Sequence, residues 1–448
     1  MNRTPHLVLK ITSFLVFGHI CCGQFSSAQA ALLQTIDIPS SLNPVGSGAR
    51  ALGMGGAFIG VADDATAASW NPGGLIQLET PEISVVGAYF DRTEDNTFGT
   101  NSEASGREGV TGTQLNYFSL AHPFHRFERN MVVSLNYQHL YDFSRSWQLP
   151  LTESIPGLYT QARNINYEQS GGLAAYGLAY CVQFTPTVSF GLTLNFWENW
   201  ANQNDWDETI IDKGSGTLGS VPFDYEGKSY DQYSFTGLNA NLGMLWRVTP
   251  ELTLGAVFKT PFTADLDHRH RSSLAVVSPD PALNSTQTYN LDVAEELDMP
   301  MSYGLGLAYR FSDQFTVSAD LYRTEWGDFT HKDWLGNESS PISGKPESES
   351  DISATHQLRL GAEYLFTRQN YAIPFRGGLF YDPAPAEGSS DNFYGFSIGS
   401  GISYKQFIFD IAYQYRFAHD VGKSILVPFE FSQDIKEHTL YTSMIVHF

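Results

Sequence analysis

The chain is short of cysteine and of basic residues. It has three cysteines among 448 residues, and two of them, Cys21 and Cys22, lie in an N-terminal segment with the composition of a cleaved leader. The third, Cys181, then has no partner for a disulfide, so the fold of an exported protein has to be held together in another way. Lysine and arginine number 26 against 48 acidic residues, which gives a formal net charge of −22. So acidic a chain is a poor partner for nucleic acid, and we exclude that class.

Long apolar runs are also lacking. The most apolar stretch, residues 11–22, is about 12 residues long, whereas a membrane-spanning helix needs about 20. It follows Arg3 and Lys10 and precedes Ala28-Gln29-Ala30, which is the order of a secretory signal and its cleavage site. No small residue directly precedes either cysteine of this stretch, as a lipoprotein signal would require. We therefore predict a signal peptide over residues 1–30 and export of the remaining chain.

Aromatic residues and glycine are plentiful instead. Aromatic residues make up 14% of the chain and glycine occurs 40 times, while charged residues reach only 17%, which fits neither a disordered chain nor a helical membrane protein. Segments of about ten residues with alternating apolar and polar side chains recur, and such alternation is typical of membrane β-barrels. We predict fourteen strands, at residues 82–90, 113–121, 130–142, 167–183, 187–199, 230–247, 251–267, 290–311, 315–325, 353–366, 372–381, 393–404, 407–417 and 438–448.

The segment 407–417 gives the clearest example of this alternation. Aromatic side chains such as Phe407 and Phe409 point to one face and polar ones such as Asp410 and Gln414 to the other, because adjacent side chains of a strand face opposite ways. One face suits lipid and the other suits water. A soluble sandwich would alternate as well, with its apolar face inward, so alternation alone leaves that alternative open.

The connections between the predicted strands weaken the sandwich alternative. From the third strand onward every second connection is short, as in Thr185-Pro186-Thr187 and Val248-Thr249-Pro250. The intervening connections are long and polar and fill residues 91–112, 143–166, 200–229, 268–289, 326–352, 382–392 and 418–437. This pattern is typical of barrels with tight periplasmic turns and longer extracellular loops.

The last predicted strand carries an independent signal. Met444, Val446 and the final Phe448 form an alternating face that resembles the C-terminal insertion signal of bacterial outer-membrane proteins. We therefore expect the bacterial outer membrane as location, and the barrel-assembly machinery, membrane lipid and lipopolysaccharide as partners. Because an open edge would leave unpaired backbone groups in lipid, the sheet has to close. The predicted fold is all-β, a 14-stranded antiparallel transmembrane β-barrel over residues 81–448.

The lumen of such a barrel needs a filling. Fourteen strands enclose more space than the inward side chains of about eight strands would fill. Residues 31–80 precede the first strand, are rich in glycine and alanine, and contain a stretch that accommodates two or three short helices. We predict that they form an N-terminal helical hatch, or plug, in the lumen. A G-x-G-x-x-A match at Gly46–Ala51 lacks the strand and the βαβ unit that a dinucleotide site needs.

Three pieces of the predicted hatch carry a resemblance to a known family. They are Gly48–Ala57, Ala62-Asp63-Asp64-Ala65 and Asn71-Pro72-Gly73. Together they resemble the hatch of the FadL family, outer-membrane transporters of long-chain fatty acids and aromatic hydrocarbons, in which an Ala-Asp-Asp-Ala-like step comes before an Asn-Pro-Ala motif. Gly73 stands where that motif has alanine. The predicted hatch-motif residues are Asp63, Asp64, Asn71, Pro72 and Gly73.

The resemblance implies passive uptake of hydrophobic compounds, with no cofactor and no enzymatic step. Substrate would enter through the extracellular loops, pass to a pocket above the hatch, and leave sideways into the membrane at a kink in the third strand. The third predicted strand, residues 130–142, has no glycine or proline that would indicate a kink. Two alternatives belong to other classes. One is a protein-secretion shuttle or anchor with a similar hatch; the other is a barrel phospholipase, for which we find no compelling Ser, His and Asn or Asp set.

Five inward-facing side chains are the predicted substrate-binding residues. Extrapolated alternation places Lys259, Arg359 and Arg376 in the lumen, where a fatty-acid carboxylate would need a cation. Trp197 and Phe380 also face inward and would line an apolar path. The alternative is a structural ion network, in which these cations pair with the inward-facing carboxylates of Asp320, Glu363 and Asp410.

Two polar groups in the expected loops receive no binding role. Acidic side chains crowd two loops and could hold Ca²⁺ or bridge lipopolysaccharide, but an EF-hand pattern is lacking and a solvated loop is the simpler reading. They are Asp205, Asp207, Glu208, Asp212, Asp224 and Glu226 in one loop and Glu347, Glu349 and Asp351 in the other. His268 and His270 flank Arg269 in a third loop. Because no cysteine or third histidine is near them in sequence, we predict no metal site there.

Overall fold

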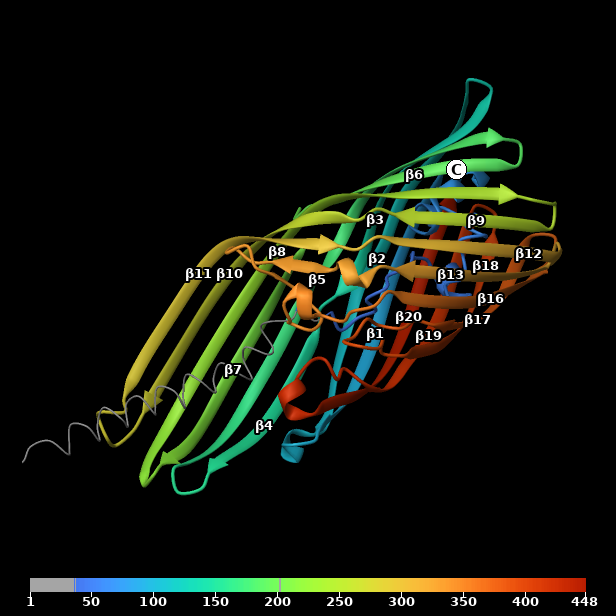
Figure 1. Cartoon of the computed structure of the whole chain (residues 1–448). Helices are drawn as coiled ribbons and strands as arrows, with labels where there is room; N and C mark the ends of the chain where they lie inside the picture. Colours follow the sequence, from blue (N-terminus) through green and yellow to red (C-terminus); the bar gives the residue numbers. More distant parts are fainter. Residues whose placement is uncertain (1–35, 37, 201–202) are drawn as a thin grey trace, which may run out of the picture.

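The computed structural model of the protein describes residues 36, 38–200 and 203–448. The predicted signal peptide, residues 1–30, and the first five residues of the predicted hatch lie outside this range. Figure 1 shows a closed barrel that holds the hatch, drawn in blue, and a long sheet that continues from one end of the barrel. No helix in the described part of the chain is long and apolar enough to cross a membrane.

Fourteen antiparallel strands form the barrel. Each pairs with the next in chain order, and the last pairs with the first. The strands are β1 (Glu82–Phe98), β2 (Gly106–Arg126), β3 (Arg129–Asp142), β5 (Tyr159–Thr185), β6 (Val188–Trp197), β8 (Val221–Arg247), β9 (Leu252–Lys259), β12 (Ser302–Ser312), β13 (Phe315–Thr324), β16 (Thr355–Thr367), β17 (Tyr371–Tyr381), β18 (Phe393–Tyr404), β19 (Phe407–Val421) and β20 (Phe431–His447). The predicted fold class, an all-β 14-stranded antiparallel barrel, is confirmed.

The outer surface of the barrel is apolar and its inner surface is polar. Leu305, Leu358 and Ile398 are 63, 55 and 58% exposed on the outer face. Ser318 and Asp410, on inward faces, are buried. A soluble sandwich would instead bury its apolar side chains against one another, so this distribution is the one expected for strands in lipid.

The structure also contains a second sheet, which we call the extension sheet. It consists of β4 (Arg145–Ile155), β5, β7 (Asp205–Leu218), β8, β10 (Phe262–Val277), β11 (Ser285–Met299), β14 (Thr330–Lys332) and β15 (Glu338–Ser339), paired in this order. β5 and β8 have 27 residues each and run through both sheets. The extension therefore continues the barrel wall without a linker (Figure 1).

Residues 143–166, 200–229 and 268–289 were predicted to be long polar loops, and this was wrong, because most of their described residues pair in the extension sheet. Their composition is polar because one face of the sheet is solvated. The other face alternates with it and buries large side chains such as Trp206 and Ile210, which are each 2% exposed.

Two predicted strands, 251–267 and 290–311, each turned out to be two strands. β9 ends at Lys259 and β10 begins after Pro261, while β11 ends before Pro300 and β12 begins at Ser302. Proline cannot donate a hydrogen bond to a strand ladder, so it interrupts the pairing at both places. These interruptions mark the boundary between the barrel and the extension.

The hatch consists of short helical turns inside the barrel. It comprises α2 (Ala49–Gly53), α3 (Ala67–Trp70) and the 3₁₀ helix η1 (Pro72–Gln77). α2 contacts β17 to β20, and η1 contacts β5, β6 and β8. Phe58 and Trp70, both buried, meet edge to face at 5.8 Å between ring centroids. Four further 3₁₀ helices lie in connections: η2 (Ser102–Ala104), η3 (Trp326–Asp328), η4 (Glu347–Glu349) and η5 (Val427–Phe429).

Paired glycines in the barrel wall let the hatch backbone approach closely. Gly191 and Gly243 are directly opposite each other on β6 and β8. A Cβ on Gly243 would lie 2.2 Å from the Oδ1 of Asn71. Gly361 and Gly378, opposite each other on β16 and β17, face the hatch in the same way. Part of the high glycine content therefore serves close contact between the hatch and the wall.

The C-terminal strand closes the barrel. β20 pairs with β19 on one side and with β1 on the other. Met444 and Phe448 are 48 and 68% exposed on the outer face, and Val446 is partly exposed. Their role as an insertion signal stays a prediction.

Candidate ligand-binding site

Asn71 fastens the hatch motif to the wall. Its amide nitrogen donates to the backbone carbonyls of Ile59 and Met244, both at 2.9 Å. Its Oδ1 accepts from the N–H of Gly73 at 3.0 Å, and Pro72 begins η1 between them. Asn71 is fully buried. One side chain thus holds two turns of the hatch and strand β8 together.

Two carboxylates hold turns of the hatch by accepting backbone N–H groups. Asp64 Oδ1 accepts from the backbone N–H and the hydroxyl of Thr66, at 2.8 and 2.6 Å. Asp320 of β13 accepts from the N–H groups of Phe58 and Ile59, at 2.7 and 2.9 Å. Asp320 therefore caps the hatch backbone, where the sequence alternative had paired it with a cation.

Ion pairs link the hatch to the wall at another point. Arg50 donates to Asp63 at 2.6 Å and to Glu363 of β16 at 2.9 Å. Glu363 also accepts from Arg376 at 2.5 Å, and Arg376 donates to Asp410 of β19 at 2.5 Å. Arg376 borders neither of the two cavities described next. Arg376 therefore takes part in the structural ion network that was the alternative to substrate binding.

Two cavities lie between the hatch and the extension. Cavity A, of about 130 Å³, is bordered by Arg92, Gln138, Leu140, Arg359, Phe380 and Arg416. Cavity B, of about 70 Å³, is bordered by Leu42, Leu140, Trp197, Lys259, Phe262 and Trp326. The segment Asn43–Val45 borders both and separates them. A third cavity, of about 500 Å³, lies at the short turn of residues 248–250, on the other side of the hatch. The hatch therefore divides the lumen.

Arginine side chains line cavity A. Arg359 donates to the carbonyl of Gly55 at 3.0 Å and lies 5.4 Å from the centroid of the Phe380 ring. Arg416 lies 3.7 Å from the centroid of the Phe393 ring, and its Nε is 3.6 Å from a carboxylate oxygen of Asp382. The Nε and Nη1 of Arg416 make no hydrogen bond to any residue that the structure describes.

Cavity B is lined by apolar rings and one lysine. Trp197 stacks on Phe262 with ring centroids 5.8 Å apart, and its Nε1 donates to Asn239 at 3.0 Å. Lys259 donates to the carbonyl of Pro44 at 3.1 Å. Four of the five predicted substrate-binding residues therefore border the cavities, Arg359 and Phe380 at cavity A and Trp197 and Lys259 at cavity B.

The barrel wall beside cavity A is incompletely paired. The ladder between β2 and β3 stops at the pair of Tyr117 and Gln138. β2 continues its pairing with β1 as far as Gly106, and β3 continues with β5 as far as Asp142. Over these described residues, β2 and β3 separate. Because Gln114, Asn116 and Leu140 also border cavity A, the separation lies directly beside it.

A bulge accompanies this separation. The register between β3 and β5 shifts between His139 and Tyr141. A Cβ on Gly172 of β5 would lie 2.5 Å from Nε2 of His139 and 2.8 Å from the carbonyl oxygen of Tyr141, so the bulge requires glycine on the neighbouring strand. Gly171, with φ of +120°, precedes it. The sequence signal of the bulge thus lay in Gly171-Gly172 and not in β3.

A comparison with known families agrees with this arrangement. The family model described as outer membrane protein transport protein (OMPP1/FadL/TodX) matches residues 28–424. The chain belongs to this family. The predicted location in the bacterial outer membrane and the predicted resemblance to FadL are thereby confirmed. No curated protein matches the sequence at a significant level.

Solved structures of similar fold support the family assignment. A FadL homologue of Pseudomonas aeruginosa matches with a TM-score of 0.58 and 14% identity, over 91% of this chain and 100% of that one. The toluene transporter TodX of Pseudomonas putida matches with a TM-score of 0.53 and 15% identity, over 90 and 98%. The toluene transporter TbuX of Ralstonia pickettii matches with a TM-score of 0.52 and 14% identity, over 91 and 99%. At sequence identities this low, the similarity to these structures shows only that the fold is shared.

Proposed function

We propose that this OMPP1/FadL/TodX family member takes up hydrophobic compounds with an acidic head group, such as long-chain fatty acids, by passive passage. The observation that carries the proposal is Arg416. It is 4% exposed, borders cavity A, and has two guanidinium nitrogens without a hydrogen-bond partner among the described residues. Leaving a buried cation partly unpaired is costly, and a ligand carboxylate would accept a charge-assisted hydrogen bond from one of these nitrogens. A neutral aromatic ligand would leave these nitrogens unpaired.

The apolar part of the ligand fits cavity B. Trp197, Phe262 and Leu42 offer rings and an aliphatic chain, and Lys259 stands at the edge. The two cavities, of about 130 and 70 Å³, are each smaller than the roughly 300 Å³ at which sites for drug-sized ligands begin. We infer that binding displaces the segment Asn43–Val45 and joins them.

The present fastening of that segment supports this step. Asn43 donates to Asp382 at 3.1 Å and to the carbonyl of Pro383 at 2.7 Å. Asp382 is also the carboxylate nearest Arg416. A ligand carboxylate that takes over Arg416 would therefore compete with the contacts that hold Asn43 in place.

We further propose that the ligand leaves sideways, between β2 and β3. Three points support this route. The ladder between the two strands ends at Gln138, and they separate beyond it. The opening lies beside cavity A. The hatch closes the direct path from there to the third cavity. With the short turns on the periplasmic side, the extension sheet faces the outside of the cell and directs ligand to the cavities.

Uptake by intact bacteria tests the proposal. The protein is produced in a host that lacks its own fatty-acid transporter, and entry of radiolabelled oleate and of labelled toluene is measured. Arg416→Gln should lower oleate entry by about 10-fold or more, because a charged hydrogen bond contributes about 1.5–3 kcal/mol, while toluene entry stays unchanged. Arg247→Gln, at the third cavity, is the matched control.

The outcomes separate the substrate classes. Oleate entry that depends on Arg416 and not on Arg247 supports the acidic amphiphile. Toluene entry without oleate entry would assign the protein to neutral aromatic compounds instead. If neither compound enters faster than in the host alone, the transport proposal itself fails.

A further inference from the structure

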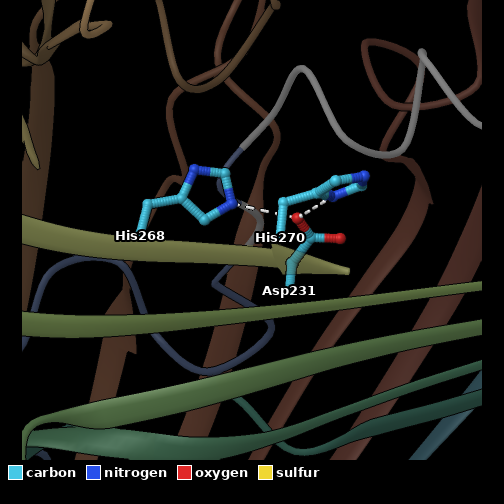
Figure 2. A group of neighbouring side chains, drawn as sticks. All are labelled: Asp231, His268 and His270. Atoms are coloured by element: carbon cyan, nitrogen blue, oxygen red, sulfur yellow. Dashed lines mark hydrogen bonds and ion pairs between the residues drawn. The ribbon is translucent and has the colours of Figure 1, made fainter. Parts of the chain in front are cut away.

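A group of histidine and carboxylate side chains lies on the inner face of the extension sheet, outside the ligand cavities. Asp231 of β8 is directly opposite His270 of β10, and His268 precedes His270 by two positions on the same face. Asp231 Oδ1 is 2.9 Å from Nε2 of His268 and 2.7 Å from Nδ1 of His270. Figure 2 shows both imidazole rings turned toward this one carboxylate.

The second nitrogen of each imidazole also has a polar neighbour. Nδ1 of His268 is 3.3 Å from the carboxylate of Glu295 on β11, and Nε2 of His270 is 3.0 Å from the hydroxyl of Ser272. Histidines that bind a metal through one nitrogen usually engage a carboxylate, carbonyl or water through the other, which fixes the ring and its tautomer. Ser272 engages the ring of His270 in this way, and the carboxylate of Glu295 faces Nδ1 of His268 at 3.3 Å. Nε2 of His268 and Nδ1 of His270 both face Asp231.

The surroundings of the group add a third imidazole. His331, on β14, is 3.0 Å from the carboxylate of Glu295. Tyr233 stacks on the ring of His268 with centroids 4.2 Å apart. In the sequence, His268 and His270 have no cysteine or third histidine nearby, and for this reason no metal site was expected there. Pairing of β8, β10, β11 and β14 supplies the side chains that the local sequence lacked.

We propose that Asp231, His268 and His270 bind a divalent transition-metal ion of the Zn²⁺ class. Their three ligand atoms lie within 4.8 Å of one another. Around a tetrahedral ion with bonds near 2.1 Å, neighbouring ligand atoms are about 3.4 Å apart, so the two contacts of Asp231, at 2.9 and 2.7 Å, would open by roughly 0.5 to 0.7 Å. Two imidazoles and one carboxylate select Zn²⁺, Ni²⁺ or Cu²⁺ over Ca²⁺ and Mg²⁺, which prefer all-oxygen sites.

The site is accessible from solvent. The side chains of His268 and His270 are 14 and 16% exposed, while that of Asp231 is 2% exposed. An ion can therefore enter from the open side, and that side leaves a fourth coordination position for water. The ion would link β8 to β10. Because Glu295 also contacts His331 of β14, the ion would be coupled to that strand as well.

Metal binding by the whole untagged barrel in detergent tests the proposal, because a polyhistidine tag would itself take up the ion. The protein is dialysed against Co²⁺ or Zn²⁺ after treatment with a chelator, and bound metal is measured together with the visible absorption of Co²⁺. The expected result is one tightly bound ion per barrel. It should be lost in His268→Ala/His270→Ala, and Glu295→Gln should weaken the affinity about 10- to 100-fold, as loss of a supporting carboxylate does at other sites.

His419→Ala is the matched control, because His419 also contacts an aspartate, Asp434 at 3.2 Å, but is 66% exposed. The number of metal ions bound per barrel and the metal affinity of His419→Ala should equal those of the wild type. If the double variant fails to fold, judged by its electrophoretic mobility with and without heating, Glu295→Gln and Asp231→Asn decide. Binding that is absent in the wild type, or unchanged in the folded variants of this group, overturns the proposal.

Discussion

At the scale of single residues, Asn71 shows how one buried amide can hold a hatch in place. Its two donated bonds go to different parts of the structure, one to the hatch turn at Ile59 and one to β8 at Met244. An aspartate of the same shape could not donate these bonds, and alanine would remove both of them. The motif residue therefore has a mechanical role that its chemistry explains.

Asn71→Ala should loosen the hatch without dismantling the barrel. An unsatisfied buried acceptor costs about 1–3 kcal/mol, so local opening of residues 45–78 should become roughly 5- to 150-fold more frequent. Amide hydrogen exchange of the hatch, followed by mass spectrometry, measures this. Asn101→Ala, at a partly exposed position in the β1–β2 connection, should leave the hatch unchanged. Equal exchange in both variants would show that Asn71 does not fasten the hatch.

Residue-level prediction from sequence succeeded where strand alternation sufficed. Alternation placed Arg359 and Lys259 in the lumen, and both border a cavity. It missed Arg92, which lay in an expected loop and belongs to the long strand β1. Whether an inward cation meets a cavity or a carboxylate depends on the neighbouring strand and on the hatch, as Arg376 shows, and one sequence does not contain that information.

At the scale of elements, the hatch fits closely against the barrel wall because glycines of the wall face glycine or backbone atoms of the hatch. A Cβ on Gly378 would lie 2.1 Å from the backbone nitrogen of Gly55. The adjacent Gly377 has only the carbonyl of Ser397 near such a Cβ, at 3.9 Å. Two neighbouring glycines of β17 thus differ in their contact with the hatch and make a matched pair.

Gly378→Ala should displace the hatch, whereas Gly377→Ala should not. The added methyl group of the first variant overlaps hatch backbone, which cannot rotate away as a side chain would. We expect a raised ion conductance in planar bilayers for Gly378→Ala and wild-type conductance for Gly377→Ala. Urea unfolding should also show a loss of about 1–3 kcal/mol for the first variant alone. Equal conductance in the two variants would refute the close fit.

The elements themselves were predictable to different degrees. Each of the fourteen predicted strands overlaps one barrel strand, because a barrel strand has to alternate. The extension sheet escaped prediction although Trp206 and Ile210 alternate in it, since its solvated face makes the average composition polar. Pro261 and Pro300 marked the junction between the two sheets, and their meaning becomes clear only from the strands on either side.

At the scale of the whole molecule, the barrel and the extension sheet are one continuous wall. β5 and β8 pass through both, so the inner face of the extension leads directly to cavities A and B. The apolar cluster nearest those cavities includes Trp197, Trp206 and Phe235. A separate cluster near the far end contains Tyr159, Phe223 and Val276. The two clusters should differ in their importance for uptake.

Shortening the β10–β11 hairpin tests this division. Replacing residues 273–288 with a two-residue turn joins Ser272 to Tyr289, which are opposite each other in the register, and removes only the far cluster's share of the hairpin. No barrel pairing is lost, because the barrel strands next to this hairpin are β9 and β12. Oleate entry should stay within about 2-fold of wild type, while Trp206→Ala should lower it about 10-fold, because truncation of this buried ring opens a cavity in the cluster beside cavities A and B. The opposite order would place the capture of ligand at the tip of the extension.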